Sequence, residues 1–160
     1  MIEAIQRNVT WRAIPIAGIV GGTVFLLINM IFNPLLYGID AFFILRYFGS
    51  LVLGTDALMD SSPLVLVVGA LVHYFLSILF TLFIAILVHR WGLLVGIIGG
   101  GLIGLGIYLI NFYTMTILFE WMFAINNTLI VISHIAFGAV AGGIYEMMDS
   151  YDEEFMEDSA

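Results

Sequence analysis

The stretch PLVLVVGALVHYFLSILFTLFIAILV, residues 63–88, decides the fold class, because it contains no Asp, Glu, Lys or Arg. A helix needs about 20 apolar residues to cross roughly 30 Å of hydrocarbon. Three further stretches reach that length, namely residues 13–36, 93–119 and 127–145. Backbone groups in lipid must find their partners within the segment, so each stretch is predicted to be a helix. The sequence therefore predicts an all-α membrane protein with a bundle of four transmembrane helices.

Composition supports the same class. The chain is 62% hydrophobic and 10% charged, whereas soluble domains are about 45–50% apolar and about 25% charged. A soluble fold of this length has too much surface to hide so many apolar side chains. The chain has no cysteine, which excludes disulfides and thiolate chemistry. Its four arginines are scattered, so no basic patch is present to bind nucleic acid.

The connections predict the topology. Residues 40–54 are apolar but too short to span, so we expect an interfacial or re-entrant helix between the first two spans. Arg7, Arg12 and Arg90 fall on one side of the bilayer and Arg46 on the other. The positive-inside rule then places both termini in the cytoplasm, in a multi-pass protein of the inner (plasma) membrane.

The C-terminal end is acidic. Seven of the twelve acidic residues fall in the last fifteen positions: Glu146, Asp149, Asp152, Glu153, Glu154, Glu157 and Asp158. Such a charged stretch cannot bury enough apolar surface to order itself. Residues 149–160 are therefore predicted to be a disordered, solvated cytoplasmic tail.

Small residues recur at four-residue spacing on three of the predicted spans, which is typical of close helix packing in membranes. These residues are Gly18 and Gly22, then Gly96, Gly100 and Gly104, then Gly138 and Gly142. The simplest interpretation is packing inside the bundle. The alternative is a glycine-lined groove that admits a planar ligand or a partner helix.

Aromatic residues near the span ends fit interfacial belts. They are Trp11, Tyr37, Tyr47, Trp91, Trp121 and Tyr145.

Polar side chains inside spans are the best pointers to function in a membrane protein. A candidate intramembrane cluster consists of Asn29, Asn33, Ser77, Asn111 and Tyr113, together with His73 and His134. No charged residue lies deep in any predicted span. That pattern argues against a proton pump or an ion-coupled transporter.

The two intramembrane histidines permit three interpretations. His73 and His134 lie at about 15 Å and about 10 Å below the outer ends of their spans, at 1.5 Å per residue, so they can face each other. As packing residues, they would form hydrogen bonds to neighbouring helices. As axial ligands, they would hold a b-type haem, with Gly69 and Gly138 giving room for the porphyrin edge. As a metal site, they would bind copper or another metal, with Met59 as a further ligand.

Hydrolytic catalysis is not indicated. Ser133 and His134 are adjacent, so they point about 100° apart on a helix of 3.6 residues per turn. No Gly-x-Ser-x-Gly or His-Glu-x-x-His motif occurs. The chain is therefore expected not to be an enzyme.

Four segments carry a family resemblance: HYFLSILF at 73–80, YLINFY at 108–113, FEW at 119–121 and HIAFG at 134–138. They resemble a group of uncharacterised small bacterial four-span membrane proteins, some of which are automatically labelled sodium:proline symporter. The resemblance implies a four-span fold and a set of polar positions, but no activity. The symporter label lacks a physical basis here, because the chain has no inverted repeat and no broken helix.

Taken together, the sequence predicts a non-catalytic integral membrane subunit. It would pack against other membrane subunits or itself, in a larger assembly such as a respiratory or redox complex. The alternative is a b-type haem electron carrier that uses His73 and His134. A small channel or carrier is disfavoured by the lack of intramembrane charge.

Overall fold

The computed structural model describes residues 9–158, which fold into helices with no β-strand among them. Four segments are long and apolar enough to cross a membrane by length and composition: Ala13–Tyr37, Pro63–Val88, Leu93–Ile117 and Thr128–Asp149. They correspond to α2 (Ala13–Tyr37), α4 (Pro63–Val88), α5 (Leu93–Leu109) with its extension, and α6 (Thr128–Asp158). The predicted all-α fold with four long apolar helices is confirmed.

Local chemistry sets the ends of the first two spans. Pro63 begins α4, where its missing N–H costs nothing because the first N–H groups of a helix have no partner in the helix. Gly38 ends α2 with a φ of 64°, a left-handed conformation that glycine adopts without strain. Its N–H donates to the carbonyls of Asn33 and Pro34, which closes the helix.

A short apolar helix, α3 (Phe43–Leu53), lies between the first two spans, as predicted for residues 40–54. It packs closely on α4 at Gly49 and Gly69. A methyl group added at Gly69 would overlap the carbonyl oxygen of Leu45. The single-turn 3₁₀ helix η1 (Thr55–Leu58) then leads into the loop before α4.

The third span loses its regular geometry in its second half. After Leu109 the chain forms a π-helical segment, η2 (Ile110–Thr114), then two 3₁₀ segments, η3 (Met115–Ile117) and η4 (Glu120–Ile125). The sequence predicted one uniform helix over residues 93–119. The difference falls where glycine-rich helix gives way to Asn, Phe, Tyr and Thr, which are weaker helix formers.

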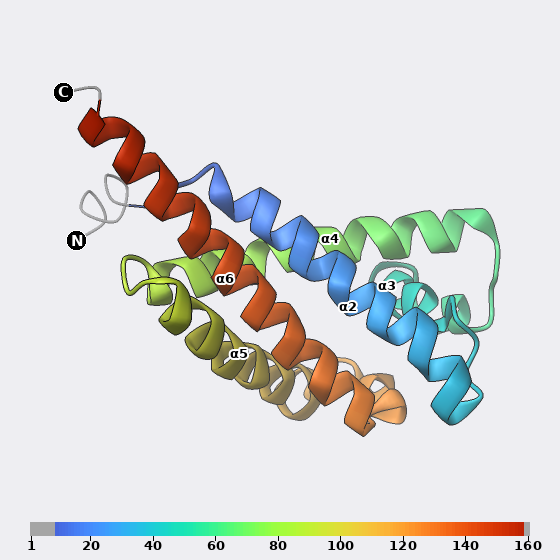
Figure 1. The fold of residues 1–160 in the computed structure, drawn as a ribbon. Coiled ribbons are helices and arrows are strands. Elements are labelled where there is room, and N and C mark those ends of the chain that lie inside the picture. The colour runs from blue at the N-terminus through green and yellow to red at the C-terminus, as the bar shows by residue number, and fades with distance from the viewer. Residues whose placement is uncertain (1–8, 159–160) are drawn as a thin grey trace.

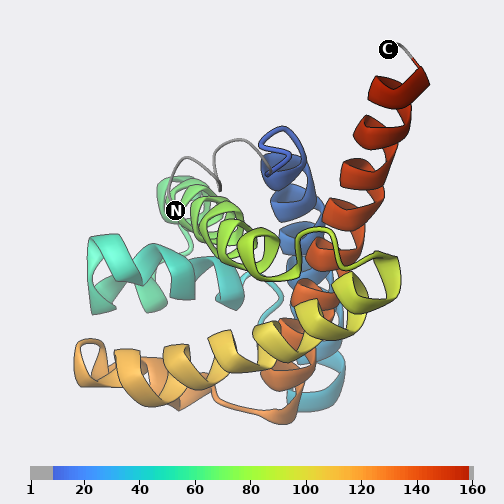
Figure 2. The ribbon, with the colours of Figure 1, turned by 90° about the vertical axis from the view of Figure 1, so that its left-hand side faces the viewer.

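The helices form two layers that diverge from one end. Helix α6 packs along α2 and α5, while α4 crosses behind them at a steep angle (Figure 1). Figure 2 shows α3 and α4 on one side of the molecule and α5 with its irregular extension on the other. The two layers meet at the turn between α4 and α5. The cavity described below is lined by residues of both layers.

Helix α6 differs from its predicted extent. It continues to Asp158, whereas residues 149–160 were expected to be a disordered tail. Its junction with the bundle is anchored: Asp149 accepts a hydrogen bond from the Thr10 hydroxyl and pairs with His89 at 3.3 Å. The N–H of Gly92 also donates to Glu146 at 2.8 Å. Glu146 and Asp149 are thus buried, and the helix leaves the bundle already formed.

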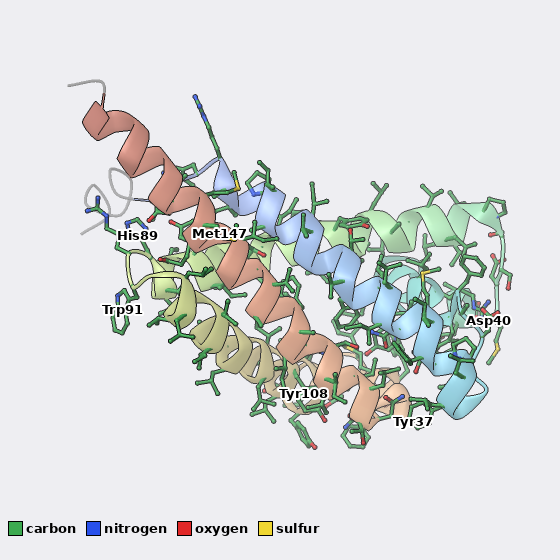
Figure 3. All side chains as sticks on the ribbon, in the orientation of Figure 1. Tyr37, Asp40, His89, Trp91, Tyr108 and Met147 are labelled. Atoms are coloured by element: carbon green, nitrogen blue, oxygen red, sulfur yellow. The ribbon has the colours of Figure 1, made fainter. Side chains whose placement is uncertain are left out.

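The aromatic belt prediction needs correction at Tyr145. This side chain is fully buried, because its hydroxyl bonds His89 and accepts from the N–H of Thr10. Trp91 and Tyr37 are exposed at the ends of the bundle, as Figure 3 shows. Arg7, used above to predict orientation, lies outside the described residues, as do residues 159–160.

Candidate functional site

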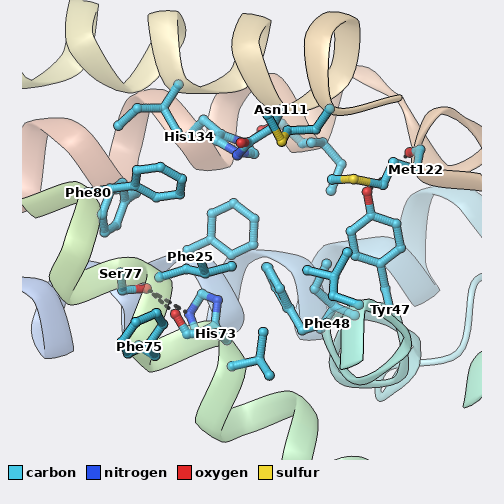
Figure 4. A pocket seen from close by; sticks show the side chains of 18 of the residues that line it. Phe25, Tyr47, Phe48, His73, Phe75, Ser77, Phe80, Asn111, Met122 and His134 are labelled. Atoms are coloured by element: carbon cyan, nitrogen blue, oxygen red, sulfur yellow. Dashed lines mark hydrogen bonds between the residues drawn. The ribbon is translucent and has the colours of Figure 1, made fainter. Parts of the chain in front are cut away.

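A cavity of about 550 Å³ lies between the two layers. It is lined by residues of α2, α3, α4, the α5 extension and α6, with α4 forming its floor and α5 and α6 its roof in Figure 4. The lining is almost wholly apolar and rich in phenylalanine. Its polar side chains include His73, Ser77, Asn111 and His134, and none of the described residues that line it is charged.

The cavity reaches the lipid-facing surface beside α4. Three lining residues, Leu71, Phe75 and Val52, are 66%, 66% and 67% exposed. In a transmembrane bundle, large apolar side chains exposed at this level face hydrocarbon. The cavity is therefore a cleft with an apolar opening beside α4.

Helix α3 forms one wall of the cleft and is tied to η4 by two hydrogen bonds. The Tyr47 hydroxyl donates to the carbonyl of Met122 at 3.2 Å, and Trp121 Nε1 donates to Ser50 Oγ at 3.0 Å. Burial raises the pKa of Tyr47 above its ordinary value, so the hydroxyl stays protonated and able to donate. Tyr47 was predicted to be a belt residue. It is instead buried and lines the cavity.

On the floor of the cleft, His73 is held against α2. Its Nε2 lies 2.9 Å from the carbonyl oxygen of Gly22 and 3.4 Å from Ser77 Oγ. A carbonyl can only accept, so Nε2 carries the proton of the neutral ring. Ser77 donates to the backbone carbonyl of His73 at 2.8 Å. The lone pair of this imidazole is therefore at Nδ1.

On the roof, His134 has the opposite tautomer. Its Nδ1 lies 2.8 Å from the carbonyl of Ile130, so Nδ1 carries the proton. Its Nε2 then accepts from the amide of Asn111 at 3.4 Å. Asn111 belongs to the π-helical segment, and such segments are frequent at functional sites because they redirect side chains.

The two imidazoles line one cavity, as their depths suggested, but they do not face each other directly. The ring of Phe25 lies between them, with centroids 5.4 Å from His73 and 5.0 Å from His134. The space beside Gly69 and Gly138, expected for a porphyrin edge, is filled by the backbones of Leu45 and Gly100. Haem ligation by this pair stays a prediction that requires Phe25 to move.

The metal-site interpretation finds no cluster in the part of the chain that the structure describes. No group of three His, Asp or Glu side chains there is placed to hold an ion. Met59, suggested as a further ligand, is 88% exposed in the loop before α4 and does not line the cavity.

The predicted intramembrane cluster separates into two groups. Ser77 and Asn111 lie in the cleft with the histidines. Asn29 and Asn33 form a ladder at the α2–α6 contact instead: Asn33 donates to Asn29, which donates to Ser133 Oγ at 2.9 Å. Tyr113 is 57% exposed and packs edge to face on Tyr108, away from the cleft.

The glycines predicted to pack helices all lie at helix contacts within the chain. Gly96, Gly100 and Gly104 face α6, and they pack against its backbone around Gly138 and Gly142. Gly18 and Gly22 face Ile78 and Ser77 of α4. The faces that suggested a groove for a partner helix are thus occupied by the chain's own helices.

Sequence reasoning missed the aromatic part of the site. Phe25, Phe48 and Phe112 line the cleft, but phenylalanine inside an apolar span carries no signal that separates it from a lipid-facing residue. The contribution of α3 was also missed. Its Tyr47 lies on the same face as the buried Ile44 and Ser50, a pattern at helical spacing that could have indicated burial.

The resemblance to small four-span bacterial proteins stays a prediction, because comparison with protein-family models, curated proteins and solved structures found no match to this chain.

Proposed function

We propose that this chain is a non-catalytic integral membrane protein that binds an apolar molecule taken from the bilayer in the cleft between α4 and α5. The observation that carries the proposal is the cavity itself. Its volume of about 550 Å³ falls in the range of roughly 300–1,000 Å³ that is typical of small-molecule sites. Its side opening supports entry from lipid rather than from water.

Selectivity in such a cleft must come from shape and polar contacts. Lipid tails are as apolar as the lining, so moving a hydrocarbon chain from lipid into the cleft gains little hydrophobic energy. The rings of Phe25, Phe48 and Phe112 give a rigid wall, and His73 and Asn111 give polar contacts. These features support recognition of one kind of molecule rather than passive filling by any lipid.

The polar groups support binding rather than catalysis. Ser77 and Ser133 both donate to backbone carbonyls of their own helices, at 2.8 Å and 2.7 Å. Each histidine commits its N–H to a carbonyl in the same way. A hydroxyl whose proton is held by a carbonyl is not activated as a nucleophile by a neighbouring base.

The test is to fill the cleft and follow the bound molecule. Ile107 is buried and lines the cavity, so Ile107→Trp should occupy the ligand's space. Leu102→Trp is the matched control, because Leu102 is 66% exposed on the same helix and does not line the cavity. Mass spectrometry of the purified protein should find a small apolar molecule in the parent and in Leu102→Trp, and not in Ile107→Trp. Equal recovery from all three would refute the proposal.

A role as an accessory subunit is a second proposal. It is supported by α6, which extends beyond its membrane span as a helix to Asp158 in an acidic stretch. A basic segment of another integral membrane subunit, such as one in a redox assembly, could contact this helix. Truncation after Ser150 should then shift the native-gel mobility of the solubilised assembly, whereas unchanged mobility would count against it.

A b-type haem carrier is the third proposal, supported only by the two imidazoles in one cavity. An optical spectrum of the protein in mild detergent decides it. A Soret band that is lost in His73→Ala and in His134→Ala would favour haem. A colourless preparation from haem-supplemented cells would count against it.

A further inference from the structure

We infer that the molecule bound in the cleft is a neutral lipid alcohol whose hydroxyl donates to Nδ1 of His73. This inference rests on the proposed function and adds the chemical class of the ligand. Three features of the cleft lead to it: an acceptor without a donor, a lining without charge, and an opening into hydrocarbon.

The acceptor is Nδ1 of His73. The proton of this ring is at Nε2, where it meets the carbonyl of Gly22, so Nδ1 has a lone pair. No described residue donates to it, and Nδ1 is not among the described side-chain atoms that are both buried and unpaired, so it is reachable from the cleft. An acceptor on the wall of an apolar cleft gains a hydrogen bond only from a molecule that brings an O–H or N–H, so the site favours such a molecule over plain hydrocarbon.

Water is a poor donor at this position. The imidazole is enclosed by the rings of Phe25, Phe48 and Tyr74, with centroids 5.4, 4.7 and 5.3 Å away. A buried water needs two to four polar partners to be stable, and aromatic rings do not supply them. A hydroxyl attached to an apolar chain needs only the one hydrogen bond, because the rest of the molecule suits the lining.

The lining also excludes charged lipids. None of the described residues around the cavity carries a positive charge that could pair with a carboxylate or phosphate. Arg46 of α3 is held by Asp40 at 3.1 Å and by Ser61 at 2.9 Å, and it does not line the cavity. An unpaired anion in this apolar space would carry a large desolvation cost. Phospholipid headgroups are therefore poor ligands, and a fatty acid can enter only after its carboxylate is protonated, which costs free energy at neutral pH.

The opening beside Leu71 and Phe75 gives room for the hydrocarbon tail of the ligand. With its hydroxyl at His73, an alcohol can extend its hydrocarbon tail past these residues into the bilayer. A long-chain alcohol from the membrane satisfies all three features, whereas a carbonyl-only or ether lipid cannot donate to Nδ1.

Trp121 offers an optical readout of occupancy. Its ring packs on Phe119, which lines the cavity, at a centroid distance of 5.3 Å. Trp11→Phe and Trp91→Phe leave Trp121 as the single tryptophan, and both replaced residues are exposed. The full chain in phosphatidylcholine nanodiscs would be titrated with four mid-chain-dibrominated probes, since bromine quenches tryptophan. The probes are octadecanol, its methyl ether, octadecane and octadecanoic acid.

The expected result is saturable quenching, with octadecanol binding about 5- to 10-fold more tightly than octadecane, as one added hydrogen bond predicts. The methyl ether, which cannot donate, should match the alkane, and the acid should not exceed it. His73→Phe should bring the alcohol to the level of the alkane, whereas Thr81→Ala, on the same helix but outside the lining of the cavity, should keep the preference.

Other outcomes distinguish failure of the alcohol inference from failure of the proposed apolar binding site. Saturable but equal binding of alcohol, ether and alkane would overturn the alcohol inference and leave the apolar cleft standing. Preference for the acid, or a preference for the alcohol that survives in His73→Phe, would also overturn it. Absence of saturable quenching by any probe would overturn the proposed function itself. The ether comparison needs no variant, so it decides the donor question even if His73→Phe fails to fold.

Discussion

Gly100 and Gly106 lie six positions apart on α5 and have opposite surroundings. A methyl group at Gly100 would overlap the carbonyl oxygen of Gly138 on α6, whereas one at Gly106 would meet nothing within 4 Å. Gly100→Ala should therefore destabilise the bundle by about 1–3 kcal/mol, the usual cost of overpacking. Gly106→Ala should leave stability unchanged or raise it by about 0.5–1 kcal/mol, because alanine favours the helix. Reversible unfolding in mixed micelles measures both, and equal losses would contradict the close α5–α6 contact.

Single residues also show where sequence reasoning stops. The depths of His73 and His134 placed them at one level of the bilayer, and the structure puts both in one cavity. The ring of Phe25 between them could not be foreseen, because its position depends on how α2 rotates against α4 and α6. Asn29 likewise bonds Ser133 rather than a histidine, since a rotation of one residue, about 100°, changes which helix a side chain faces.

The short helix α3 acts as the outer wall of the cleft, and its link to η4 consists of two hydrogen bonds. Removing both with Tyr47→Phe and Ser50→Ala should let water-soluble reagents reach the cavity. The chain has no native cysteine, so Met115→Cys, which lines the cavity, provides a single reactive thiol. Its modification by a polar maleimide should accelerate roughly 30-fold when two hydrogen bonds of about 1 kcal/mol each are lost. Tyr37→Phe, at the exposed end of α2, is the control and should leave the rate unchanged. An unchanged rate in the double variant would show that α3 does not close the cleft.

Among the helices, the long regular ones were predictable from the sequence and the irregular ones were not. The bounds of α2 and α4 follow from uninterrupted apolar runs, because the bilayer fixes the length of a span. The change to π-helix at Ile110 has no such signal. Phe112 of this segment is buried in the core, and such tertiary packing is not visible in the sequence. The length of α6 was underestimated for a similar reason, since composition does not reveal that Thr10 and His89 anchor Asp149.

For the whole molecule, contacts at one end fix the relative positions of the start of α2, the α4–α5 turn and α6. Thr10 lies before α2, His89 follows α4, and Tyr145 lies near the end of the membrane-length part of α6, Thr128–Asp149. Hydrogen bonds join the three residues. The start of α2, the α4–α5 turn and the C-terminal part of α6 must therefore lie on the same side of the bilayer. Figure 1 shows these segments together at one end of the bundle. The loop before α4 lies at the opposite end.

Which side is cytoplasmic remains the prediction made from the arginines, and two exposed positions test it. Met59→Cys lies in the loop before α4 and Trp91→Cys in the α4–α5 turn; the native residues are 88% and 70% exposed. If the positive-inside rule holds, a membrane-impermeant maleimide should label Met59→Cys in intact cells and Trp91→Cys only after lysis. The reverse pattern would keep the fold and invert its orientation. Labelling of both positions from outside would contradict the fold itself, because α4 would then not cross the membrane.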